Sequence, residues 1–104
     1  ILQALIQIAL YLPRTRIKFD QQQMVQDAIL MRLQEIGENL VRIRQIDEEW
    51  FVERGDESWD KFIGLRNIIS HGYHLIDADQ IWQIVTEELP KFEIHIRDLT
   101  LEFE

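Results

Sequence analysis

The sequence has 104 residues, of which 46% are hydrophobic, 11 are basic and 19 are acidic, so its formal net charge is −8. A chain of this length folds around one core, so we expect a single domain over residues 1–104. No apolar run approaches the ~18 residues that a membrane span needs. The absence of cysteine excludes disulfides and thiolate chemistry, and it fits a cytoplasmic location. The excess of acidic residues argues against a general nucleic-acid binder.

The first predicted element is a buried helix over residues 1–12, in which almost every second or third residue is aliphatic. Pro13 ends it, because proline cannot continue a helix. Residues 13–19 then form a basic connector. The basic side chains lie mainly in residues 1–66, which hold 9 of them against 11 acidic ones, so we expect any anionic ligand to contact this part of the chain. A solvated acidic surface is the simpler interpretation of the charge alone.

The second predicted helix begins near Asp20 and Gln23, which have the spacing of a capping box. Apolar residues then recur at helical spacing over residues 25–43. The pattern predicts a helix of roughly 22–25 residues, six or seven turns long. Gly37 lies in its interior at a cost of about 1 kcal/mol relative to alanine. A glycine in that position indicates close approach by another helix or another chain.

Residues 45–57 are acidic, and Gly55 makes them turn-like. Ser58 is positioned to cap a third helix, with a core stripe of Trp59, Phe62, Ile63, Ile69 and Tyr73. Trp59, like Trp50 and Trp82, is typical of a core or interface anchor.

A fourth helix begins at a second capping box, formed by Asp77 and Gln80. Pro90 is expected to kink it. Its apolar stripe is Ile81, Ile84, Val85, Leu89, Phe92, Ile96 and Leu99. Helices joined by short connectors predict an all-α, up-and-down bundle of four to five helices.

Chemistry is concentrated at the end of the third helix, where Leu65-Arg66-Asn67-Ile68-Ile69-Ser70-His71-Gly72-Tyr73-His74 carries six polar side chains. Arginine supplies a forked cation that matches phosphate oxygens. Histidine gives or takes a proton near neutral pH. Together these groups are sufficient for phosphodiester chemistry without a metal.

Helix geometry limits how these side chains can meet. At 100° per residue, Arg66 and Tyr73 are about 20° apart on the helix, whereas His71 is about 140° from Arg66. One straight helix therefore cannot aim Arg66 and His71 at the same point. Either the helix ends or loosens at Gly72, or two copies of the chain assemble the site across a two-fold axis; we prefer the dimer.

The segment Arg66-Asn67-Ile68-Ile69-Ser70-His71-Gly72-Tyr73 resembles the Arg-x4-His-x-Tyr signature of HEPN ribonuclease toxins, specifically the HepT group. The resemblance covers roughly residues 19–92. It includes Phe19-Asp20, Ala28, Ile36-Gly37-Glu38-Asn39, Trp59, Gly64-Leu65-Arg66-Asn67, Ile76-Asp77, Ile81-Trp82 and Leu89-Pro90. His74 after Tyr73 is less typical of the group.

The resemblance implies a homodimer of HEPN-like helical domains in which the two motifs face each other across an RNA-cleaving cleft. By position, Arg66 would hold the scissile phosphate and His71 would act as general acid or base. The HepT group implies a partner as well: an MntA-like nucleotidyltransferase antitoxin that attaches AMP to Tyr73. Asn67, Ser70 and Glu38 would support the site or contact RNA. We expect no metal and no cofactor in this chain.

The same residues also have purely structural interpretations. Arg66 is also suited to an ion pair with Glu38 or Glu35, and in the first case Glu38 would orient it. His71 by itself is typical of a histidine that is hydrogen-bonded within the core or at an interface. Tyr73 is, by default, a packed aromatic with its hydroxyl at the rim.

The remaining polar residues of the segment have weaker alternatives. His71, His74 and Asp77 are spaced three residues apart and could suggest a metal site. Successive ligands at that spacing point in different directions around a helix, and no fourth ligand is evident. Ser70 is adjacent to His71, so their side chains point about 100° apart and do not form a nucleophile–base pair. Asn67 is suited either to a phosphate or to a backbone carbonyl.

These observations predict an intracellular toxin with endoribonuclease activity. The alternative is a non-catalytic helical module that dimerises and binds a nucleotidyltransferase, and a nucleotide-binding bundle without cleavage activity is a third hypothesis. RNA cleavage by the unmodified chain distinguishes the first hypothesis from the other two.

Overall fold

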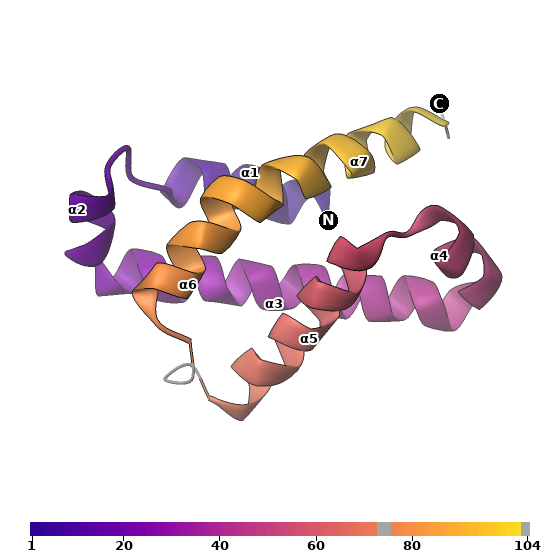
Figure 1. The fold of residues 1–104 in the computed structure, drawn as a ribbon, viewed down its shortest axis with the longest axis horizontal. Helices are drawn as coiled ribbons and strands as arrows, with labels where there is room; N and C mark the ends of the chain where they lie inside the picture. Colours follow the sequence, from indigo (N-terminus) through magenta and orange to yellow (C-terminus); the bar gives the residue numbers. More distant parts are fainter. Residues whose placement is uncertain (73–75, 103–104) are drawn as a thin grey trace.

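The computed structural model describes residues 1–72 and 76–102, which contain helices and no strand. The long elements are α1 (Leu2–Tyr11), α3 (Gln23–Ile46) and α5 (Glu57–His71), followed by α6 (Ala78–Gln83), a π-helical turn η2 (Ile84–Glu88) and α7 (Leu89–Glu102). Figure 1 shows α1, α3, α5 and the α6–α7 segment running alternately in opposite directions. The all-α, up-and-down arrangement is therefore confirmed, whereas the described residues contain more helices than the expected four to five. No helix in the described ranges combines the length and apolarity that a membrane crossing requires.

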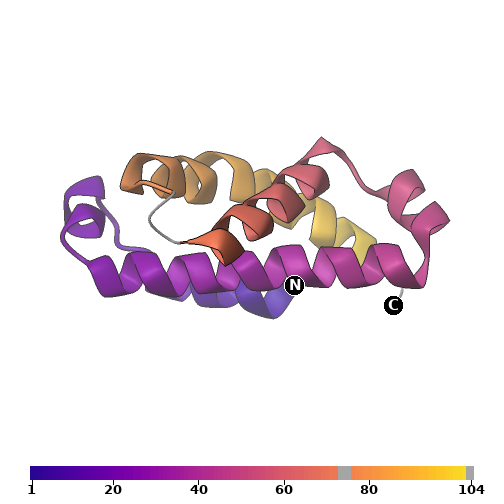
Figure 2. The ribbon, with the colours of Figure 1, turned by 90° about the horizontal axis from the view of Figure 1, so that it is seen from below.

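Helix α3 is the longest element, and the other helices pack around it (Figure 2). The buried stripe expected on α5 is confirmed for Trp59, Phe62, Ile63 and Ile69. The Phe62 and Phe92 ring centroids lie 4.6 Å apart and join α5 to α7. The least exposed large side chains are Trp59, Phe19, Phe62, Phe92, Ile8, Ile29, Leu30, Leu33, Ile36, Leu40 and Ile81. One core therefore unites residues from both halves of the chain.

Two segments expected to be connectors contain short helices. Within the basic connector, α2 (Arg16–Asp20) forms because the Thr15 hydroxyl caps it and Phe19 is fully buried. Asp20 belongs to this helix and pairs with Arg16, so it cannot cap the next one. The predicted Asp20–Gln23 capping box is wrong: α3 starts after Gln22, without a side-chain cap.

The acidic segment before α5 also departs from the prediction. It contains α4 (Glu48–Arg54), whose first turn is capped by the Asp47 carboxylate, which accepts a hydrogen bond from the Trp50 amide. Burial of Phe51 holds this helix against the core. The predicted cap of α5 is shifted by two residues: Asp56 is the N-cap, and its carboxylate accepts from the Ser58 amide at 2.8 Å.

The C-terminal helix begins as predicted, with the reciprocal capping box of Asp77 and Gln80. The disturbance expected from Pro90 takes the form of η2, in which the Leu89 amide donates to the Ile84 carbonyl, five residues back. Pro90 has no amide hydrogen for the Thr86 carbonyl, so the wider turn forms where a regular hydrogen bond is already missing. The apolar stripe stays buried on both sides of η2.

Candidate active site

Helix α5 carries the polar motif in its last two turns. Its regular geometry extends to His71, where Gly72 ends it with a φ of 157°, a backbone conformation that other residues rarely adopt. Arg66 and His71 therefore both lie within the helix, which does not loosen between them. Tyr73 and His74 lie outside the described residues.

The crossing of α5 over α3 occurs at Gly37 and Arg66. A Cβ atom added to Gly37 would lie 2.5 Å from Arg66 Cβ and 2.7 Å from the carbonyl oxygen of Phe62. Gly37 is buried, and no other residue type fits this crossing without moving α5. The close approach predicted from the sequence is therefore confirmed, and the approaching element is the helix that carries the motif.

The guanidinium of Arg66 has one hydrogen bond and no ion pair among the described residues. One terminal nitrogen, Nη1, donates to Asn67 Oδ1 at 3.1 Å. Its Nε is buried and has no hydrogen-bond partner among the described residues. Neither carboxylate suggested as an ion-pair partner is within reach: Glu35 pairs with Arg32 at 3.0 Å, and half-buried Glu38 forms no ion pair with Arg66.

Five of the other ten lysine and arginine side chains pair with carboxylates in the described ranges. Ion pairs join Arg16 to Asp20 and Asp79, Arg32 to Glu35, Arg54 to Glu102, Lys61 to Glu88 and Arg97 to Glu93. Arg66 has no such partner among the residues described, and the same holds for Arg14, Lys18, Arg42, Arg44 and Lys91. Arg66 differs from these five because its Nε is buried without a hydrogen-bond partner. A buried, unmatched N–H on a cation is costly unless a ligand accepts from it.

The end of α5 is held to α3 by a second contact. Gln34 Nε2 donates to Ser70 Oγ at 3.2 Å. Ser70 is thus engaged with the protein, while the adjacent His71 is exposed on the final turn. Sequence reasoning did not identify Gln34. The available signal was its place one turn before Gly37, on the same flank of the helix.

The third histidine of the chain lies elsewhere. One ring nitrogen of His95, Nε2, is 2.8 Å from the Arg54 carbonyl oxygen, and the other, Nδ1, is 3.5 Å from Asp56 Oδ2. Burial raises the pKa of the Asp56 carboxyl. Hydrogen bonds from the Ser58 hydroxyl and amide and the nearby His95 ring outweigh that effect and lower the pKa below its usual value. This cluster fastens α7 to the start of α5 and shares no residue with the motif.

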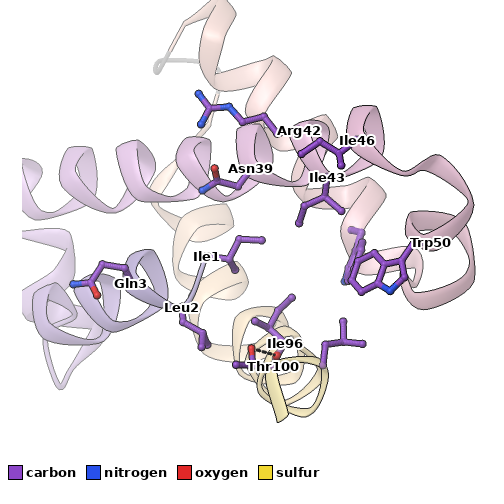
Figure 3. A pocket seen from close by; sticks show the side chains of 12 residues that line it. Ile1, Leu2, Gln3, Asn39, Arg42, Ile43, Ile46, Trp50, Ile96 and Thr100 are labelled. Carbon is purple, nitrogen blue, oxygen red and sulfur yellow. Dashed lines mark hydrogen bonds between the residues drawn. The ribbon is translucent and has the colours of Figure 1, made fainter. Parts of the chain in front are cut away.

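An apolar groove of about 570 Å³ lies between α1, α3 and α7, and no motif residue lines it. Figure 3 shows Ile1, Ile43 and Ile96 facing one another across it, while the guanidinium of Arg42 extends away from them. The groove therefore belongs to a different part of the molecule from Arg66 and His71. Within residues 1–72 and 76–102, no three His, Asp or Glu side chains are grouped to hold a metal ion.

Comparison with known proteins gives a consistent result. The family model described as "Ribonuclease HepT-like" matches residues 1–99. The chain is 33% identical over 76 residues to a Methanocaldococcus jannaschii protein named "Putative RNase MJ1380", covering 73% of this chain and 67% of that protein. It is 26% identical over 83 residues to "Gamma-glutamylcyclotransferase and putative RNase MJ0434" of the same organism, covering 80% of this chain and 36% of that protein. No solved structure matches the chain.

Proposed function

This chain belongs to the HepT-like ribonuclease family, and on that premise we propose that it is a metal-independent endoribonuclease that acts through Arg66 and His71. One observation supports this proposal most directly. The Arg66 guanidinium has a buried Nε without a partner and no carboxylate in ion-pair contact within the described residues. An RNA phosphate supplies both the negative charge and the acceptor oxygens that this cation lacks.

The chemistry assigned to these two residues is transfer of the RNA phosphodiester to its own 2′-hydroxyl. The 2′-oxygen bonds to phosphorus while the bond to the 5′-oxygen breaks, which gives a 2′,3′-cyclic phosphate and a 5′-hydroxyl. An imidazole of His71 takes the 2′-hydroxyl proton or delivers a proton to the leaving oxygen. Arg66 stabilises the charge that develops on the phosphate oxygens. His71 is exposed and thus reachable by a polynucleotide.

The geometry of α5 favours a site shared between two chains. Arg66 and His71 both belong to one unbroken helix, on which they point about 140° apart. A two-fold axis close to α5 would place Arg66 of one chain opposite His71 of the other. Pairing two motifs would also concentrate positive charge in a chain whose overall charge is negative. The protein is therefore proposed to be active as a homodimer.

Regulation is proposed to follow the pattern of the HepT group. Tyr73 comes two residues after His71 in the sequence, and it is the proposed site of AMPylation by an MntA-like nucleotidyltransferase. An attached AMP adds bulk and a negative phosphate beside the motif, and these compete with RNA by occupying space and repelling its phosphates. The chain is accordingly proposed to be the toxin of a toxin–antitoxin pair.

The proposed activity is tested with purified chain, verified by mass to be unmodified at Tyr73, in the presence of a chelator. We expect RNA fragments with 2′,3′-cyclic phosphate ends, and loss of cleavage in Arg66→Ala and His71→Ala, with helix content unchanged by circular dichroism. Arg97→Ala, which alters an exposed cation of α7, is the matched control. Absence of cleavage by wild-type chain at enzyme excess would instead favour the non-catalytic interaction module.

The proposed regulation has a separate test. Incubation with the cognate nucleotidyltransferase, ATP and magnesium should add the mass of AMP to the peptide that contains Tyr73 and should stop cleavage. The Tyr11→Phe variant should still be modified, whereas Tyr73→Phe should not. AMP found on another peptide would exclude this route of silencing and leave the cleavage mechanism intact.

A further inference from the structure

Two contacts between α5 and α3 lie beside the proposed catalytic residues. At the first, the absent side chain of Gly37 lets Arg66 Cβ and the Phe62 carbonyl sit directly on α3. At the second, Gln34 Nε2 donates to Ser70 Oγ at 3.2 Å. Gln34 and Gly37 are three residues apart on α3, and Ser70 and Arg66 are four apart on α5, so the contacts follow neighbouring turns of both helices.

We propose that Gly37 and Gln34 are positioning residues for the ribonuclease reaction. Together they set the distance of α5 from α3 and its position along the α3 axis, and thereby the positions of Arg66 and His71. This inference rests on the proposed function. Gly37 sets the distance between α3 and α5, because its lack of a Cβ allows α5 to contact α3 directly at Arg66. Gln34 sets the axial position, because its amide holds the residue next to His71.

An alanine at position 37 cannot be accommodated by a side-chain rotation. The atoms that its Cβ would meet are Arg66 Cβ and the Phe62 carbonyl oxygen, and the α5 backbone fixes both. Carbon atoms in contact prefer about 3.5–4.0 Å, so α5 would have to retreat by about 1 Å from the 2.5 Å spacing. A displacement of that size at a catalytic group can reduce the rate by about 100-fold.

Gly64 supplies the matched comparison. It lies in the same helix as Arg66, but a Cβ added there would meet nothing within 4 Å. Gly37→Ala and Gly64→Ala make the same chemical change in helix interiors and gain the same helix propensity. Any difference between them therefore reports the steric consequence at the crossing. Gln45→Ala is the control for Gln34→Ala, because Gln45 is an exposed glutamine on the same helix.

The experiment measures kcat and KM for RNA cleavage, together with the NMR signal of the Arg66 Nε–H group, assigned by its loss in Arg66→Ala. We expect Gly37→Ala to lower kcat by about 100-fold, with a smaller change in KM, and to move the Arg66 signal. We expect Gln34→Ala, which alters a surface contact and should fold normally, to lower kcat by about fivefold. Gly64→Ala and Gln45→Ala should leave both measurements unchanged at equal oligomeric state, checked by sedimentation.

The outcomes separate this inference from the proposed function. If wild type cleaves RNA and both Gly37→Ala and Gln34→Ala keep its kcat and Arg66 signal, the positioning role is excluded and the ribonuclease stands. If wild type cleaves no RNA, the proposed function fails. The positioning of a catalytic arginine then fails as well, even if Gly37→Ala moves the Arg66 Nε–H signal. If Gly37→Ala does not fold, Gln34→Ala decides. An unchanged kcat excludes the role. A kcat loss with an unchanged KM supports it when Gln34→Glu, which keeps the side-chain length and can accept from the Ser70 hydroxyl, restores kcat.

Discussion

A single arginine carries most of the functional argument because its neighbours do not neutralise it. Arg66 donates to the neutral amide oxygen of Asn67 at 3.1 Å, and its buried Nε has no partner within the described residues. An amide orients a guanidinium without cancelling its charge, whereas a carboxylate would do both. This places Asn67 next to Arg66 as a hydrogen-bond acceptor, a contact that differs from both roles weighed for it from the sequence, a phosphate or a backbone carbonyl. Asn67→Asp should weaken RNA cleavage, because the added carboxylate would pair with Arg66 and compete with the RNA phosphate.

Asp56 gives a residue-scale prediction with a defined pH dependence. Its pKa is lowered in the folded protein, so the ionised cap contributes stability at pH values above about 3.9, the usual aspartate pKa. That contribution is lost as the pH falls through the lower pKa of the folded state. We expect Asp56→Ala to cost about 1 kcal/mol in the free energy of unfolding at pH 7 and less at pH 2.5.

Urea unfolding at the two pH values measures the difference. Asp60→Ala is the control, because Asp60 lies in the first turn of α5 without being its cap. It should change the free energy of unfolding by only a few tenths of a kcal/mol. An equal loss at pH 7 and pH 2.5 for Asp56→Ala would contradict the assigned role of the carboxylate.

Helix ends and connectors are where the elements differ most from sequence expectation. Capping side chains compete locally: Asp20 joins α2 and pairs with Arg16, so α3 begins without it. Buried aromatic residues turn two expected connectors into short helices, through Phe19 and Phe51. At η2 the chain widens one turn ahead of Pro90, and its apolar residues on both sides of that turn are buried against the core.

The two helical glycines give a prediction at the scale of the element. Gly64→Ala should raise the free energy of unfolding by about 1 kcal/mol, because alanine is the better helix former and nothing obstructs its Cβ. Gly37→Ala should lower it, because the crossing with α5 must open. Chemical denaturation of both variants under identical conditions measures the two signs. A gain in stability for Gly37→Ala would show that the crossing tolerates a methyl group.

At the scale of the whole molecule, the net charge of −8 and the proposed RNA substrate are reconciled by local arrangement. Five of the 11 cations are paired with carboxylates in the described residues, for example Arg54 with Glu102 at 2.7 Å. Arg66 forms no ion pair there, and its charge is the one proposed to serve RNA. Bringing two copies together would double this local charge, whereas the paired cations add little to the field around a bound polynucleotide.

A mixing experiment tests the shared site. Arg66→Ala and His71→Ala chains, each inactive alone, should regain activity when mixed under conditions that allow subunit exchange. If each site takes Arg66 from one chain and His71 from the other, random exchange restores about a quarter of the wild-type activity. Mixing Arg66→Ala with itself is the control. Exchange without recovery, with heterodimers confirmed by mass, would place both residues of a site in one chain.

The sequence by itself determined the helical class, the alternating direction of the long helices, the buried stripes and the capping box of Asp77. It also located the motif and the family, because helical period and motif spacing are local properties that a linear pattern records. Gly37 was recognised as a point of close approach, although the approaching helix could not be named.

Only the tertiary structure decided which groups meet. It placed α5 on Gly37, joined Gln34 to Ser70, showed that Glu35 and Glu38 form no ion pair with Arg66, and continued the helix unbroken to His71. These facts depend on contacts between residues about 30 positions apart, whose geometry is set by packing of the whole core rather than by neighbours in the chain. An unpaired arginine is defined by everything around it in space, so no local pattern could reveal it.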